Sequence, residues 1–389
     1  MKCKNKLACI VLTGIVAISS ITPALAENRE FISYNNDTVE DIIYNDATEN
    51  GEDTELTPMV ASTYREYGTK LGQYGKKLYA DMVDSFSDIS TEVAVYDYNS
   101  SERPTISEFN GSKELAKQAL LLDYPEQFWN VSYIISATQT TAGKVSQVTV
   151  TAIRYNNESV ATLRSMSETM DNIASSAISA MKRDVTIKTD RDIFLWIHNY
   201  LIDHVEYDKS GDNRETSPNS YNAYGALVDN KAVCQGYSAA FQLLCHKAKV
   251  ISVIVNGTKN GAPHSWNYAQ IGNKKYFLDV TNDDAANRYF YFLKAMPNAY
   301  TAFEDGTSNR FTPENTNAFM YGDIDCDGKI SANDSALLQS DILCGNIDNY
   351  GKSDFIVADV NGNGVLTAED CSYILQKALD TSFKFPVEQ

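Results

Sequence analysis

The fold of this chain is decided by residues 232–281, which read AVCQGYSAAFQLLCHKAKVISVIVNGTKNGAPHSWNYAQIGNKKYFLDVT. The stretch holds a thiol at Cys234, an imidazole at His264 and a carboxylate at Asp279. Its pattern predicts the start of a helix, followed by strands that carry the second and third groups. These three groups are the ones that nucleophilic acyl chemistry requires. The stretch therefore predicts a cysteine peptidase or another acyl-transfer enzyme.

Local structure is expected to help each of these groups. A helix that begins near Cys234 places the thiol at the positive end of the helix dipole, which favours the thiolate. Helix-start N–H groups can also face a developing oxyanion. Gly272-Asn273 predicts a two-residue hairpin turn, which pairs residue 266 with Asp279. Asp279 would then lie diagonally across from His264 on the same face, within reach of a hydrogen bond that orients the imidazole.

The remaining histidines and the second helical cysteine predict structural roles. Cys245 and His246 are adjacent on the helix that follows Cys234, so they point apart, and no carboxylate accompanies them. His198 and His204 lie on a helix among aromatic and aliphatic neighbours. Cys234 is also about 16 Å along the helix axis from Cys245, too far for a disulfide.

The N-terminus has the three-part pattern of a secretory signal peptide. Three lysines precede an apolar run, and Ala24-Leu25-Ala26 offers a cleavage site, so residues 1–26 are expected to direct export. The apolar run is shorter than the roughly 20 residues that a membrane helix needs, and no later segment predicts a membrane span. We therefore expect an exported, extracellular protein.

The acidity of the chain is concentrated near its two ends. The formal net charge is −18, and residues 27–60 carry ten acids and one Arg. Residues 321–389 carry twelve acids and four Lys. This distribution argues against a nucleic-acid partner and indicates a cation site near the C-terminus.

Composition and periodicity divide the chain into six expected parts. These are a signal peptide (1–26), an acidic disordered leader (27–60), an N-terminal part of the catalytic region (61–185), a catalytic core (186–300), a domain end with a linker (301–320) and a C-terminal module (321–389). Within them the pattern predicts helices at 64–89 and 161–181 and another capped by Thr189-Asp190, strands at 131–135, 145–155, 250–255, 264–271 and 275–280, and loops at 219–228 and 256–261.

The C-terminal module contains a twelve-residue repeat. DIDCDGKISAND at 323–334 recurs as DVNGNGVLTAED at 359–370, and a helical pattern follows each copy. Oxygen donors at positions 1, 3, 5, 7, 9 and 12, with Gly at position 6, suit Ca²⁺. The expected ligands of the first ion are Asp323, Asp325, Asp327, the carbonyl of Lys329, Ser331 and Asp334; those of the second are Asp359, Asn361, Asn363, the carbonyl of Val365, Thr367 and Asp370. The second loop has fewer carboxylates, so we expect weaker binding there.

Residues of the central region resemble the transglutaminase-like superfamily, whose fold is papain-like. The resemblance lies in AVCQGYSAAF at 232–241, HSWN at 264–267, LDVTNDD at 278–284, NSYNAYGAL at 219–227, EYD at 206–208 and YPEQFW at 124–129. It implies that Cys234 is the nucleophile, His264 the base and acid, and Asp279 the orienting group, with no cofactor needed for catalysis. Relatives often have Trp at the position of Asn282, so this sequence departs from the family there.

The duplicated calcium loops and their helices resemble a type I dockerin. The resemblance implies a small all-α module that folds around two Ca²⁺ ions and binds a cohesin module of a scaffolding protein. The expected fold class is therefore α+β: a papain/transglutaminase-like domain, with the nucleophile at a helix N-terminus packed on an antiparallel sheet, plus this dockerin.

The expected function is a secreted, cellulosome-associated cysteine hydrolase that acts on a protein or peptide through an acyl-enzyme. Two alternatives remain open. The first is a transglutaminase that cross-links proteins, and the second is an inactive module that binds peptide or cell-wall material.

Overall fold

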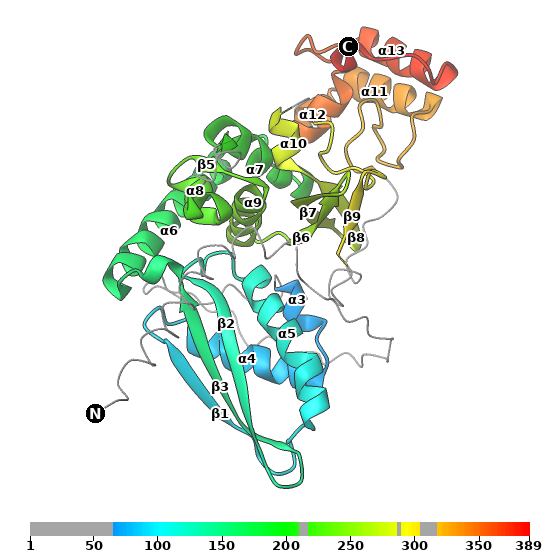
Figure 1. The fold of residues 1–389 in the computed structure, drawn as a ribbon. Helices are drawn as coiled ribbons and strands as arrows, with labels where there is room; N and C mark the ends of the chain where they lie inside the picture. The colour runs from blue at the N-terminus through cyan, green and yellow to red at the C-terminus, as the bar shows by residue number, and fades with distance from the viewer. Residues whose placement is uncertain (1–64, 210–216, 286–288, 304–316) are drawn as a thin grey trace, which may run out of the picture.

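The computed structural model describes residues 65–209, 217–285, 289–303 and 317–389 (Figure 1). The expected signal peptide and acidic leader lie outside the described residues, as does most of the expected linker. Among the helices of the described part, none is both long enough and apolar enough to cross a membrane.

The N-terminal region of the described chain is a three-stranded antiparallel sheet with helices against it (Figure 1). Its elements are α3 (Glu66–Thr69), α4 (Gln73–Phe86), β1 (Val93–Asp97), α5 (Ile106–Asp123), β2 (Asn130–Gln139) and β3 (Val145–Arg154), with the strand order β1-β3-β2. Both strands expected in this region are present. The single helix expected at 64–89 is wrong, because the chain is extended at Gly72 and starts α4 anew. The sequence reading also missed α5, although Thr105 and Glu108 form the capping box that begins it.

The central region is built around one buried helix, α9 (Cys234–Ala248). Before it come α6 (Val160–Arg183), α7 (Asp190–His204), the 3-10 turn η4 (Pro218–Tyr221), α8 (Ala223–Leu227) and the parallel pair β4 (Glu206–Tyr207) and β5 (Lys231–Ala232). Thr189 caps α7, as the sequence predicts, and it forms a capping box with Asp192. The loop expected at 219–228 is wrong, because the side chain of Asn222 caps α8 there.

A four-stranded antiparallel sheet lies against α9, in the order β8-β7-β6-β9 (Figure 1). Its strands are β6 (Ser252–Lys259), β7 (Ala262–Ile271), β8 (Lys274–Leu278) and β9 (Tyr300–Ala302). The loop expected at 256–261 is wrong. Strand β6 continues to Lys259, and the turn uses only Asn260 and Gly261, both with positive φ, which a two-residue hairpin turn requires.

The expected hairpin register is correct, but its ladder is shorter than expected. Leu278 pairs with Asn267, and the pairing then stops. Asp279 leaves the strand, and the chain turns at once into α10 (Val280–Ala285), so the strand expected at 275–280 ends two residues early.

The C-terminal module is helical. Its elements are α11 (Ala332–Cys344), the 3-10 turn η6 (Asn346–Asn349), α12 (Lys352–Ala358), α13 (Ala368–Leu379) and the 3-10 turn η7 (Pro386–Glu388). A separate small core holds it together, with Leu338, Ile374 and Phe385 fully buried. Both helices expected after the repeats are present.

Candidate active site and calcium loops

The nucleophile candidate is the first residue of α9. Val233 is the extended N-cap, and Cys234 is only partly buried, so its thiol lies at the helix start with some access to solvent. Gly236 lets the preceding segment approach, because a Cβ there would lie 2.4 Å from the carbonyl oxygen of Ser220. That segment is held by a hydrogen bond from the Val233 N–H to the same carbonyl, at 2.9 Å. Close packing therefore presents the helix start at the surface.

The structure brings the three expected groups together. His264 Nε2 lies 2.7 Å from Asp279 Oδ2, and Cys234 lies close enough to the imidazole to raise its pKa. Asp279 is buried and His264 is 11% exposed. The imidazole thus links a buried carboxylate to a partly exposed thiol, the order that a Cys-His-Asp triad requires.

The pKa values fit a charged imidazole. Burial lowers the pKa of His264, but hydrogen bonds and charge interactions with Asp279 and Cys234 outweigh it and raise the pKa to about 9. Burial raises the pKa of Asp279, yet the hydrogen bonds and charge of its partners, His264 first, leave it below its usual range. Near neutral pH the pair is therefore imidazolium and carboxylate.

Two further residues hold Asp279, and the sequence reading did not identify either as part of the site. The Tyr300 hydroxyl donates to Asp279 Oδ2 at 2.7 Å, and the Asn282 amide nitrogen donates to the same oxygen. The Asn282 backbone N–H donates to Asp279 Oδ1 at 3.1 Å. The sequence marks Asn282 only as a departure from the family pattern, and Tyr300 comes from β9, too far along the chain for local spacing to place it.

Lys259 fixes the orientation of the Asn282 amide. Its Nζ donates to Asn282 Oδ1 at 2.5 Å, so the amide nitrogen must face the triad. That nitrogen lies 2.9 Å from His264 Nε2. Both atoms are donors when the imidazole is protonated, so Asp279 Oδ2 is their common acceptor.

Replacing Asn282 by Ala is expected to lower kcat by roughly 10-fold or more with little change in KM. The variant removes a hydrogen bond to a buried carboxylate, which contributes about 1.5–3 kcal/mol. Steady-state kinetics on a peptide substrate would measure it. Asn346→Ala, which removes an exposed amide of the C-terminal module, is the control and should leave both constants unchanged. An Asn282→Ala enzyme with normal kcat would show that the amide does not position the triad.

The other candidate groups are structural in their surroundings. Cys245 is fully buried, and burial raises its pKa well above the usual value. His246 Nδ1 lies 2.9 Å from Arg65 Nη1. His198 pairs with Asp283 at 3.0 Å, and both side chains are fully buried. His204 Nδ1 lies 2.7 Å from the carbonyl of Tyr200. All five cysteines of the described residues are free.

The first repeat, residues 323–334, brings together three of the side chains expected to bind calcium. Carboxylate oxygens of Asp323, Asp325 and Asp327 lie within 4.8 Å of one another. Burial raises the pKa of Asp323 to about 6, and repulsion from the neighbouring carboxylates contributes to the rise. The Asp334 carboxylate is hydrogen bonded to the backbone instead. It forms the capping box of α11 with Ser331 and accepts the N–H of Ile324 at 2.8 Å. A group of hard, mutually repelling oxygens fits a divalent cation.

The second loop repeats the geometry of the first. Asp359 accepts the N–H groups of Asn363 and Gly364 at 3.1 and 2.9 Å. The matching bonds to Asp323 in the first loop measure 3.1 and 3.0 Å. Lys329 and Val365 are the residues expected to bind calcium through their carbonyl oxygens. Their N–H groups donate to the position-5 side chains, Asp327 and Asn363, each at 2.8 Å. Thr367 and Asp370 form the same capping box as Ser331 and Asp334.

Two family models match parts of the chain. Residues 179–280 match the model of the transglutaminase-like superfamily, and residues 321–379 match the model of the dockerin type I domain. Both resemblances and the expected fold class are thereby confirmed. No curated protein matches the chain.

Two solved structures are similar over part of the chain. One is a crystal structure of a TGase, 15% identical with a TM-score of 0.28, which covers 44% of this chain and 47% of the other. The second is a crystal structure of a candidate cysteine protease from Cytophaga hutchinsonii, 15% identical with a TM-score of 0.26, which covers 44% of this chain and 68% of the other. The chain thus spans about half the length of the first of these structures.

Proposed function

We propose that this protein is a cysteine hydrolase, a peptidase, that acts through a Cys234–His264–Asp279 triad and an acyl-enzyme. The observation that carries the proposal is the placement of His264, which hydrogen bonds with the carboxylate of Asp279 and lies close to the thiol at the start of α9. The match to the transglutaminase-like superfamily supports a cysteine-dependent reaction.

The geometry suits a two-step reaction. The Cys234 thiolate attacks the substrate carbonyl carbon, and N–H groups at the start of α9 face the oxyanion that develops. His264 gives its proton to the leaving amine as the C–N bond breaks, which leaves a thioester on Cys234. His264 then takes a proton from the water that attacks the thioester carbon, the C–S bond breaks, and the carboxylic acid product leaves, which restores the Cys234 thiolate beside the imidazolium. Asp279 holds the imidazole in the required orientation and stabilises its charged form.

Exposure of the site favours hydrolysis over transfer to an amine. Cys234 and His264 are both partly exposed, so water can reach a thioester formed there. A cross-linking enzyme would have to exclude that water and admit a primary amine instead.

Digestion of a peptide library, followed by mass spectrometry, tests this proposal. We expect new N-termini that depend on Cys234, and little incorporation of a fluorescent primary amine into a glutamine-containing protein. Amine incorporation without peptide release would identify a cross-linking transglutaminase. Neither product, with an unreactive thiol, would identify an inactive binding module.

We further propose that the C-terminal module binds two Ca²⁺ ions and attaches the enzyme to a cohesin of a scaffolding protein. The dockerin match and the repeated loop geometry support this proposal. The dockerin match also supports a location on a cellulosome or another cell-surface scaffold. The N-terminal sequence pattern supports export.

Removal of calcium is expected to abolish cohesin binding. Excess EDTA in a pull-down should reduce captured enzyme to background, because the loop carboxylates repel one another without a cation. Asp323→Asn should weaken the affinity for calcium measured by titration calorimetry, since Asp323 is the buried first ligand. Asp348→Asn, an exposed position outside both loops, is the matched control. Binding that survives EDTA would refute the calcium sites.

A further inference from the structure

The chain that enters the C-terminal module is packed against the catalytic core. Phe319 is fully buried, with ring centroids 5.1 Å from Phe292 and 5.4 Å from Tyr289. The Ala318 N–H donates to the Leu293 carbonyl at 2.9 Å. Residues 317–321 are therefore part of the core, and the C-terminal module begins directly from it.

Asp192 at the start of α7 accepts hydrogen bonds from the short helix α12 of that module. The Ser353 N–H and hydroxyl donate to Asp192 Oδ1 at 2.7 and 2.6 Å, and both side chains are fully buried. The other oxygen, Oδ2, accepts the N–H groups of Lys188 and Thr189. One buried carboxylate thus joins the first turn of α7 to the first turn of α12.

The approach of the two helices requires a glycine. A Cβ on Gly351 would lie 2.2 Å from Asp192 Oδ2, and the nearest atoms it would meet all belong to Asp192. The backbone of Gly351 has φ −72° and ψ 170°, which any residue can adopt. Glycine is needed here for space at the interface and not for backbone freedom.

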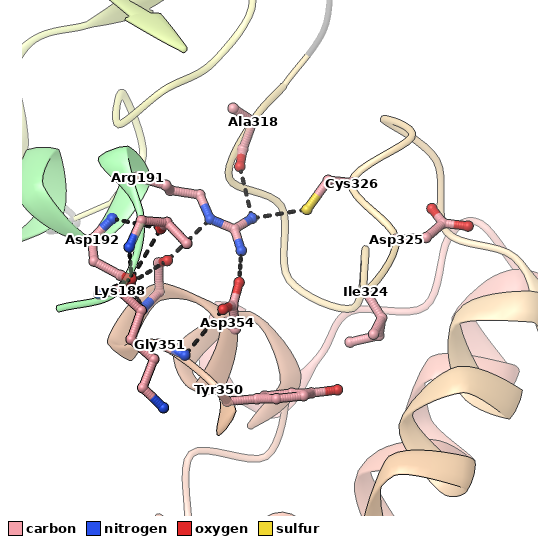
Figure 2. A network of polar contacts seen from close by, with 12 residues as sticks. Lys188, Arg191, Asp192, Ala318, Ile324, Asp325, Cys326, Tyr350, Gly351 and Asp354 are labelled. Atoms are coloured by element: carbon pink, nitrogen blue, oxygen red, sulfur yellow. Dashed lines mark hydrogen bonds and ion pairs between the residues drawn. The ribbon is translucent and has the colours of Figure 1, made fainter. Parts of the chain in front are cut away.

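Arg191 extends the interface to the first calcium loop. Its guanidinium pairs with Asp354 of α12 and donates to the Ser353 hydroxyl at 3.0 Å. Its Nη1 donates to Cys326 Sγ at 3.0 Å and to the Ala318 carbonyl at 3.2 Å. Cys326 lies between the expected ligands Asp325 and Asp327, and Figure 2 shows the Asp325 side chain turned away from the arginine.

From these contacts we infer that α12 and the first calcium loop form an interaction surface for the first turn of α7, so that calcium binding stabilises the catalytic core. A cation that orders the loop also holds Cys326 and α12 in place, and the docked α7 in turn favours the ordered loop. Helices α11 and α13 keep exposed apolar residues for an external partner: Leu343, Leu375 and Leu379 are 80%, 39% and 81% exposed. The inference rests on the proposed calcium sites but not on the proposed chemistry.

Tryptophan fluorescence during thermal unfolding of the full chain tests the inference. All three tryptophans, Trp129, Trp196 and Trp266, precede the C-terminal module, so their signal reports the catalytic part alone. Calcium at about 100 times its dissociation constant is expected to raise the tryptophan midpoint by roughly 3–6 °C relative to excess EGTA.

Gly351→Ala should abolish this calcium-dependent shift while calcium binding, measured by titration calorimetry, persists. Gly72→Ala is the matched control, because Gly72 is also an extended helix N-cap, with φ −69° and ψ 170°, and a Cβ there meets nothing within 4 Å. Ser353→Ala, which removes only a hydroxyl at the interface, should make the calcium-dependent shift smaller than in the wild type.

Two results would overturn the inference. The first is a wild-type chain that binds calcium but shows no change in its tryptophan unfolding midpoint, and the second is a calcium-dependent shift of full size in both Gly351→Ala and Ser353→Ala. Absence of calcium binding to the wild-type chain would instead refute the calcium sites. None of these measurements depends on peptidase activity, so they test the inference independently of the proposed triad.

Discussion

Cys234→Ser is expected to lower peptide hydrolysis by at least roughly 10³-fold, because the variant lacks the thiolate that forms the acyl-enzyme. A serine hydroxyl at the same position stays protonated beside an imidazolium and cannot replace it. Initial rates of peptide release, with the circular dichroism spectrum as a check on folding, would measure the loss.

Cys344→Ser supplies the matched control for this variant. Cys344 is exposed at the end of α11 in the C-terminal module, so the same substitution there should leave the rate unchanged. If Cys234→Ser retained more than a few per cent of the activity while Cys344→Ser was normal, the nucleophile would have to be another group.

Asp279→Asn is expected to lower kcat by roughly 10³–10⁴-fold, because the imidazole loses the carboxylate that orients and charges it. The same variant should shift the pH dependence. In the wild type, the imidazolium is present below the His264 pKa of about 9 and is lost as pH rises through that value. Without Asp279, burial dominates and the pKa of His264 falls, so the loss of the imidazolium moves to lower pH.

Histidine NMR titration would separate this electrostatic effect from simple misfolding. The chain has four histidines, and only His264 should change its titration in Asp279→Asn. An unchanged titration of His264 would contradict the role of Asp279, whereas changes at all four histidines would indicate a loss of fold.

The central elements of the site could be predicted because short-range signals determine them. The helix start at Cys234 and the hairpin register across Gly272-Asn273 follow from local pattern, and the register brings His264 and Asp279 together although the ladder ends at Leu278. The errors also have local causes. Asn260-Gly261 suggests a loop by composition, but two positive-φ residues are sufficient to turn β6 into β7.

The surroundings of the triad could not be predicted from one sequence. Tyr300 and Lys259 act on Asp279 and Asn282 from β9 and β6, and only the pairing of these strands brings them together. The contact between Asp192 and Ser353 joins positions 161 residues apart in the sequence. Spacing and periodicity carry no information on such contacts.

The most direct test of the central claim is alkylation of the native protein by iodoacetamide at about pH 6, followed peptide by peptide with mass spectrometry. An ordinary thiol is only about 0.3% ionised at that pH. If His264 holds Cys234 as a thiolate, Cys234 should be alkylated at least roughly 10-fold faster than the exposed Cys344 of the same molecule. A Cys234 that reacts no faster than Cys344 would contradict the triad and, with it, the proposed enzyme.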